Sequence, residues 1–191
     1  KKFMDYSVFI PLFIQNNYYT EMKIYPINSP SNYTLNLTFY SGNGELIGGK
    51  EKVLSIDKNH NTYNQLNFHE IVEKLGIDSK KVKSVLIEQN FKDKNKIPSR
   101  LKYGLNIGKQ KSKYNLPTNI CFNSEPVNEY EILKKGTFKW FPIINSSKSL
   151  AIITNSSFIK DYNKKAKIKM TIYKVDSEDI IDKIIELNPY E

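Results

Sequence analysis

The chain has 191 residues and a formal net charge of +9 at pH 7, and 39% of its residues are hydrophobic. This composition is globular rather than disordered, and a chain of this length buries a core without disulfides or structural metals. No run of 18 apolar residues occurs, so the sequence predicts no transmembrane helix. It starts at Lys1 instead of a methionine, and we therefore expect it to be part of a longer protein.

The positive charge comes from 28 lysines and a single arginine. One interpretation is a polyanionic partner such as an anionic glycan, a membrane surface or a nucleic acid. The other is codon usage, since Lys, Asn, Ile and Tyr are all abundant and all have AT-rich codons. The scarcity of Arg disfavours nucleic acid, because Arg is the residue that binds phosphate and guanine with two hydrogen bonds.

Alternation of apolar and polar residues is the main structural signal. In "TLNLTFY" the residues Leu35, Leu37 and Phe39 alternate with Thr and Asn, which predicts a strand with one buried face. The same alternation occurs in "RLKYGLNIG" and in "AKIKMTIY". Further strands are expected at 7–14, 20–26, 45–56, 82–90, 117–123, 138–144, 150–154 and 180–187.

One short helix is predicted near 68–75. Asn67 precedes it as an N-cap, and Glu70 stands three residues later, as in a capping box. Gly76 follows as the stop signal. The remainder of the chain reads as strands and turns, so we expect an all-β (mainly β) fold.

Two distant parts of the chain resemble each other, which predicts an internal repeat of 8–56 in 138–187. Leu35 then corresponds to Ile168 and Leu37 to Met170, and we expect both Leu37 and Met170 to face inward. The expected organisation is a β-sandwich unit at 1–125 and a related unit at 136–191, which either stands apart or packs into the same sandwich. The polar stretch 123–136 is the expected linker.

Strand length, turn spacing and the order of a proline, an alternating strand and a glycine turn resemble the immunoglobulin-like and fibronectin-type β-sandwich modules of bacterial secreted and surface proteins. The resemblance covers most of the chain and implies a sandwich fold. It carries no residue motif, and therefore implies no particular activity.

No catalytic or metal-binding motif is present. His60 and His69 do not have the spacing of a metal site, and both are expected to be solvated or capping residues. The lone Cys121 lies between apolar neighbours and is expected to be a buried structural thiol. The acidic stretch 175–179 is expected to be a solvated hairpin tip rather than a calcium loop. We expect no enzymatic activity, no metal and no cofactor.

Basic residues supply the candidate ligand-binding site. Arg100 and Lys102 share the solvent-facing side of one expected strand, and Lys167 and Lys169 share the solvent-facing side of another. If the two faces adjoin, they form a positive stripe for an anionic glycan or lipid surface. The alternative is a set of solvated lysines that protect strand edges. The many tyrosines offer a stacking platform, although packing in the core is the favoured interpretation for them.

The resulting hypothesis is a non-enzymatic binding or structural module of a larger bacterial secreted or cell-surface protein. Its partner is another protein or an anionic glycan, and its expected location is extracellular or at the cell surface, with a cytoplasmic location as the alternative. One alternative is a carbohydrate-active enzyme or its accessory domain, which needs two carboxylates about 5–10 Å apart in a cleft. The other is a nucleic-acid-binding domain, which needs exposed aromatic side chains and steeply salt-dependent binding.

Overall fold

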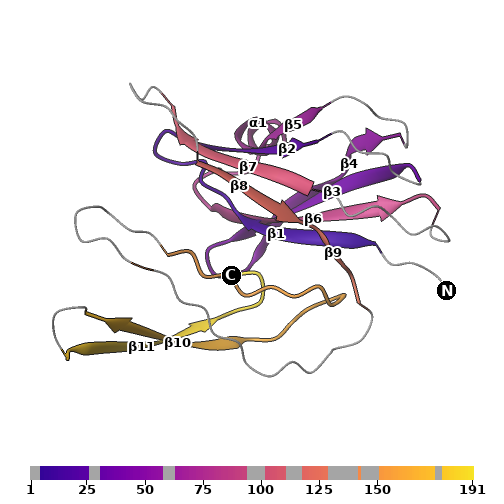
Figure 1. The fold of residues 1–191 in the computed structure, drawn as a ribbon. Helices are drawn as coiled ribbons and strands as arrows, with labels where there is room; N and C mark the ends of the chain where they lie inside the picture. Colours follow the sequence, from indigo (N-terminus) through magenta and orange to yellow (C-terminus); the bar gives the residue numbers. More distant parts are fainter. Residues whose placement is uncertain are drawn as a thin grey trace.

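The computed structural model describes residues 5–25, 31–57, 63–93, 102–110, 118–128, 142, 151–174 and 178–191. It is mainly β, with antiparallel sheets and one short helix (Figure 1). The elements are β1 (Tyr6–Pro11), β2 (Tyr18–Ile24), β3 (Tyr33–Ser41), β4 (Leu46–Ile56), β5 (Asn64–Asn67), α1 (Phe68–Lys74), β6 (Val82–Phe91), β7 (Lys102–Lys109), β8 (Thr118–Asn123), β9 (Glu125–Pro126), β10 (Ala166–Tyr173) and β11 (Ile180–Leu187).

The strands form two larger sheets and one separate hairpin. The first sheet has the order β4-β3-β6-β1-β9 and the second has the order β5-β2-β7-β8. Strands β10 and β11 pair only with each other among the described residues. The chain passes from one large sheet to the other several times, so neighbours in each sheet come from distant parts of the sequence.

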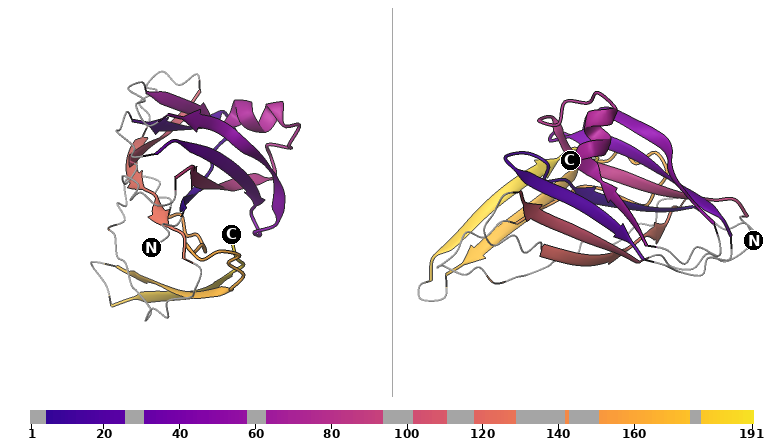
Figure 2. Two further views of the ribbon diagram at one scale, coloured as in Figure 1. Left: turned by 90° about the vertical axis from the view of Figure 1, so that its right-hand side faces the viewer. Right: turned by 90° about the horizontal axis from the view of Figure 1, so that it is seen from above.

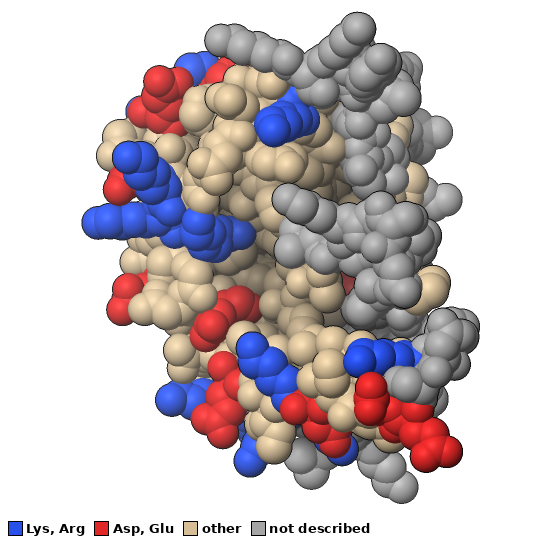
Figure 3. All heavy atoms as spheres, turned by 90° about the vertical axis from the view of Figure 1, so that its left-hand side faces the viewer, with Lys and Arg blue, Asp and Glu red and all other residues tan. Residues whose placement is uncertain are grey.

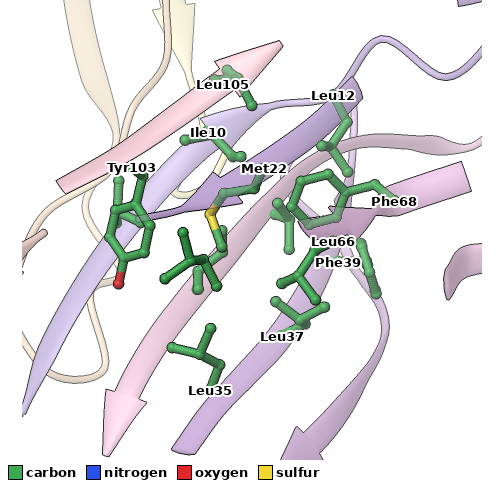
Figure 4. Close-up of a cluster of buried hydrophobic side chains, with 14 of the residues drawn as sticks. Ile10, Leu12, Met22, Leu35, Leu37, Phe39, Leu66, Phe68, Tyr103 and Leu105 are labelled. Carbon is green, nitrogen blue, oxygen red and sulfur yellow. The ribbon is translucent and has the colours of Figure 1, made fainter. Parts of the chain in front are cut away.

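The two large sheets share one hydrophobic core. The predicted alternation in β3 is confirmed, because Leu35, Leu37 and Phe39 are at most 2% exposed. Met22 of β2 and Tyr103 of β7 point into the same core from the second sheet (Figure 4). Burying each such large side chain stabilises the fold by about 1.5–3 kcal/mol. The core therefore fixes which face of each strand points outward.

The predicted helix and both of its ends are confirmed. The Asn67 side chain accepts hydrogen bonds from the backbone N–H groups of His69 and Glu70, and its amide donates to the Glu70 carboxylate at 3.0 Å. At the other end Gly76 has φ +66°, a conformation that favours glycine. Its N–H and that of the following residue, Ile77, donate to carbonyls of the last turn, which is a Schellman motif.

The β10–β11 hairpin shares part of its register with β3–β4. Leu35 pairs with Leu54, and its predicted equivalent Ile168 pairs with Ile185. The surroundings differ, because β3 also pairs with β6, whereas β11 is the one strand that pairs with β10 within the described ranges. The expected counterpart of β1 lies outside the described residues apart from Pro142, so the internal repeat stays a prediction.

The face of Met170 is only partly as expected. Leu37 is 2% exposed in the shared core, whereas Met170 is half-buried on the apolar face of the hairpin. The difference follows from the number of strands, since a two-stranded hairpin covers less surface than a five-stranded sheet packed on a second sheet.

Some strand predictions need correction. Residues 151–154 form no strand, although one was expected at 150–154. Asn155 holds this part of the chain by side-chain hydrogen bonds, as described below, and not by a β ladder. The expected strand at 138–144 lies outside the described residues apart from Pro142. The structure adds β5 and β9, which are too short to give an alternation signal.

Candidate binding face

The outer face of the first sheet is covered by the end of the chain. The Tyr190 ring stacks on the Tyr40 ring of β3, with ring centroids 4.5 Å apart and an angle of 15° between the planes. Its centroid also lies 5.7 Å from that of the Phe9 ring of β1. The Ser84 hydroxyl of β6 donates to the Tyr190 carbonyl at 3.3 Å. Tyr40 and Ser84 point away from the core, yet they are only 8% and 4% exposed. Their burial comes from this cover.

Asn155 ties the covering segment together. Its side-chain amide donates to the carbonyls of Lys164, Leu187 and Asn188 at 2.8–3.2 Å, and its side-chain oxygen accepts from the Tyr162 hydroxyl. Its backbone N–H donates to the carbonyl of Glu191. Asn155 is 5% exposed, so these bonds satisfy a buried polar group. The covering segment therefore blocks the outer face of the first sheet around Phe9, Tyr40 and Ser84.

The outer face of the second sheet is polar and is the better candidate for a binding surface. Because Met22 and Ile24 of β2 point into the core, Glu21 and Lys23 point outward. The register places Gln65 of β5 and Gly104 of β7 on either side of Lys23. The outward positions of these strands thus carry amide, charged and small residues.

Lys23 is the centre of a hydrogen-bonded cluster on this face. Its ammonium donates to the Tyr63 hydroxyl at 2.6 Å and to the Gln65 side-chain oxygen, and lies 3.5 Å from the Glu21 carboxylate. The Tyr63 hydroxyl donates to the same Gln65 oxygen at 2.9 Å. The ammonium also lies 5.2 Å from the centroid of the Tyr63 ring. We call Glu21, Lys23, Tyr63 and Gln65 the Lys23 cluster.

The cluster holds Lys23 in its charged form. Partial burial works against the charge, but the hydrogen bond from the ammonium to Tyr63 and the charge of Glu21 outweigh it, so the pKa of Lys23 is raised above its usual value. The side chains of Lys23 and Glu21 are 17% and 19% exposed. A ligand on this face meets a cation whose position is already fixed, with the ring of Tyr63 beside it 49% exposed.

Tyrosines continue along β2 at the end away from Tyr63. An added Cβ on Gly108 would lie 2.5 Å from the Tyr19 hydroxyl oxygen, so Tyr19 lies flat on the backbone at Gly108. The Lys109 ammonium lies 5.8 Å from the ring centroid of Tyr18, which is 42% exposed. The prediction that tyrosines belong to the core holds for Tyr33 and Tyr103, whereas Tyr40 is buried under Tyr190 instead, and Tyr18 and Tyr25 are exposed.

The described members of the predicted basic site do not lie in one sheet. Lys102 begins β7, in the second sheet, and pairs with Asn123 of β8. Lys167 and Lys169 are exposed on β10, in the separate hairpin. Lys169 pairs with Asp182 at 2.8 Å. Arg100 lies outside the described residues, so the positive stripe stays a prediction.

Cys121 corrects another expectation, because it is exposed rather than buried. It pairs with Gly104 of β7, whose neighbours Tyr103 and Leu105 point into the core, so Cys121 has an outward position. An apolar neighbour did not indicate burial here, since Ile120 is itself 45% exposed. His69 lies in the first turn of α1, half-buried, and His60 lies outside the described residues. The described residues of the acidic stretch 175–179, Glu178 and Asp179, are exposed.

No group of three or more His, Cys, Asp or Glu side chains in the described part of the chain is arranged to hold a metal ion. None of the helices formed by those same residues is long and apolar enough to cross a membrane.

Comparison with protein-family models, curated proteins and solved structures finds no match to this chain. The class that the fold defines is a mainly β protein with several antiparallel sheets.

Sequence reasoning missed the Lys23 cluster as a unit. The alternation of Glu21, Met22, Lys23 and Ile24 does mark the first and third as outward. Nothing in the sequence shows that β5 pairs with β2, because the two strands are about 40 residues apart. Without that pairing, the contact between Lys23 and Tyr63 cannot be predicted.

Proposed function

We propose that this chain is a non-enzymatic binding module with an immunoglobulin-like or fibronectin-like β-sandwich fold, within a larger bacterial secreted or cell-surface protein. We further propose that it contacts a glycan through the outer face of its second sheet. Two sheets that share one core support the sandwich. The cover over the first sheet supports the choice of face, because it leaves the second sheet as the open one.

The Lys23 cluster is the observation that carries the proposal. A sugar presents hydroxyl groups that need fixed donors and acceptors, and C–H faces that pack on aromatic rings. The cluster supplies a charged donor, a carboxylate and an amide, all held by one another, next to the half-exposed ring of Tyr63. The net charge of +9 favours an acidic glycan over a neutral one.

The test is affinity electrophoresis in gels that contain heparin, as the anionic polysaccharide, or a neutral glucan. We expect heparin to retard the wild type, and Tyr63→Ala to bind roughly tenfold more weakly because it loses the ring and one partner of Lys23. Tyr173→Ala is the matched control, since Tyr173 is an exposed tyrosine on the hairpin, 72% accessible. It should bind like the wild type.

Three results would overturn the proposal. The first is that neither gel retards the wild type. The second is that Tyr63→Ala and Tyr173→Ala lose the same amount of affinity. The third is that the wild type binds single-stranded DNA but neither polysaccharide. A separate variant, R100E/K102E, tests the contribution of charge near the start of β7. It should weaken binding to heparin more at low salt than at high salt, because charge attraction is screened.

A further inference from the structure

The β10–β11 hairpin is a two-stranded sheet whose outer edges pair with no other described strand. It lies below the two large sheets in Figure 1 and in the left-hand view of Figure 2. A hairpin of this kind is marginal in stability by itself, and an unpaired edge presents backbone groups that pair readily with another strand. Its large apolar side chains are also exposed, with Ile180 at 58% and Ile184 at 60%.

The two strands carry opposite charges on one face, which we call the charged face. The register places Lys167 opposite Glu186 and Lys169 opposite Ile184, with Thr171 opposite Asp182. β10 thus contributes two lysines to the charged face, and β11 contributes two carboxylates. Figure 3 shows both signs mixed over the lower part of the molecule, where the hairpin lies.

These charges select one mode of pairing between copies of the chain. Pairing β10 with β10 would bring lysines together, and pairing β11 with β11 would bring carboxylates together, and both arrangements are unfavourable. Pairing β10 of one copy with β11 of the next brings lysines against carboxylates. It also places Tyr173 beside Ile180 of the next copy when the register of the hairpin is repeated.

We propose that the hairpin joins copies of this chain head to tail, with β10 of one copy paired antiparallel to β11 of the next. Such a contact uses two different surfaces, so each added copy presents a new free edge and the assembly is open-ended. Lys169 and Asp182 form an ion pair within the hairpin, but they are 64% and 47% exposed. Asp182 also accepts a hydrogen bond from the Thr171 hydroxyl at 2.7 Å, and Lys169 of a neighbouring copy would approach the part of its carboxylate that stays exposed.

The opposing consideration is that lysines on edge strands prevent aggregation. In this hairpin the lysines are confined to one strand of the charged face. They repel a second β10 strand and attract a β11 strand. The same residues that block one mode of pairing therefore favour the other, which gives the contact its direction.

The first experiment measures the weight-average mass of the full chain by light scattering over a range of concentrations. At low salt we expect the mass to rise past twice the monomer mass of 22.3 kDa without levelling off at a dimer. At about 1 M salt the mass should fall, because surface charges are then screened within a few ångströms. A monomer at every concentration, or a closed dimer, would overturn the proposal.

The second experiment uses a charge-swapped chain, K167E/K169E/D182K/E186K. This chain keeps opposite charges within its own hairpin, so the hairpin is retained. The swapped chain should assemble with itself as the wild type does, but not with the wild type, because every mixed β10–β11 contact then joins like charges. Energy transfer between dye-labelled chains measures this, with high transfer within each type and background transfer between them. Equal transfer in the mixture would show that charge does not direct the contact.

Discussion

Tyr190 stacks on Tyr40 with ring centroids 4.5 Å apart, although the two residues are 150 positions apart in the chain. The stack joins the end of the chain to the outer face of the first sheet, beside the hydrogen bond from Ser84 to the Tyr190 carbonyl. An aromatic pair contributes about 0.5–1.5 kcal/mol beyond its buried area. Tyr190 therefore has an identifiable part in holding the covering segment.

We predict that Tyr190→Ala releases this segment while the two large sheets stay folded. Hydrogen exchange at the Asn155 amide, which donates to Glu191, should accelerate strongly, whereas exchange within β6 should not change. Tyr190→Phe keeps the ring and should behave like the wild type. Equal acceleration in both variants would assign the effect to the hydroxyl group and not to the stack.

The half-buried Glu88 makes stability depend on pH. Burial, together with the charges of Asp5 and Asp161, raises its pKa above the usual value. The folded state then binds a proton more tightly than the unfolded state, so stability rises as pH falls through the raised pKa toward 4.5.

Glu88→Gln removes this effect. The variant should melt at a higher temperature than the wild type at neutral pH, and the difference should shrink as the pH is lowered toward 4.5. The matched control is Glu73→Gln, an exposed carboxyl on α1. A difference between Glu88→Gln and wild type that is constant across this pH range would contradict the prediction.

Leu37→Ala should cost about 2–5 kcal/mol of unfolding free energy, because Leu37 is 2% exposed and its loss leaves a cavity in the core. Ile168→Ala should cost less, since Ile168 is half-exposed on the hairpin and water fills part of the space. Chemical denaturation of the two variants compares them directly. An equal cost would mean that the hairpin is buried as deeply as β3.

Gln89 lies fully inside the core, and neither its side-chain nitrogen nor its oxygen has a hydrogen-bond partner among the described residues. A buried polar group without a partner costs about 1–3 kcal/mol. Gln89→Met, which has nearly the same shape, should therefore raise the melting temperature. Gln65→Met on the outer face should not, because Gln65 accepts hydrogen bonds from Lys23 and Tyr63. A lower melting temperature for Gln89→Met would mean that the amide is satisfied in solution.

Local signals in the sequence were reliable where a residue's neighbours in the chain determine its environment. The alternation at Leu35 and Leu37 gave the buried face of β3, and Asn67 and Gly76 gave both ends of the helix. These features depend on backbone geometry over a few residues.

Contacts between distant segments were not predictable in the same way. The alternation of side chains gives Cys121 an outward position only once its pairing with Gly104 is known, because Tyr103 and Leu105 on either side of Gly104 are buried. Nothing near Tyr190 marks it as a partner of Tyr40. The Lys23 cluster needed the pairing of β5 with β2, and single-chain patterns do not encode which strands become neighbours.

The central position of β6 in the first sheet has a consequence for folding during synthesis. β1 and β3 are synthesised first, but both pair with β6, which begins only at Val82. Until β6 leaves the ribosome, the edges of β1 and β3 that will pair with it have no partner. Contacts between such distant segments slow folding and prolong exposure to aggregation. Chaperone dependence during synthesis should therefore be greatest before residue 91 emerges, and fall once β6 has joined its two neighbours.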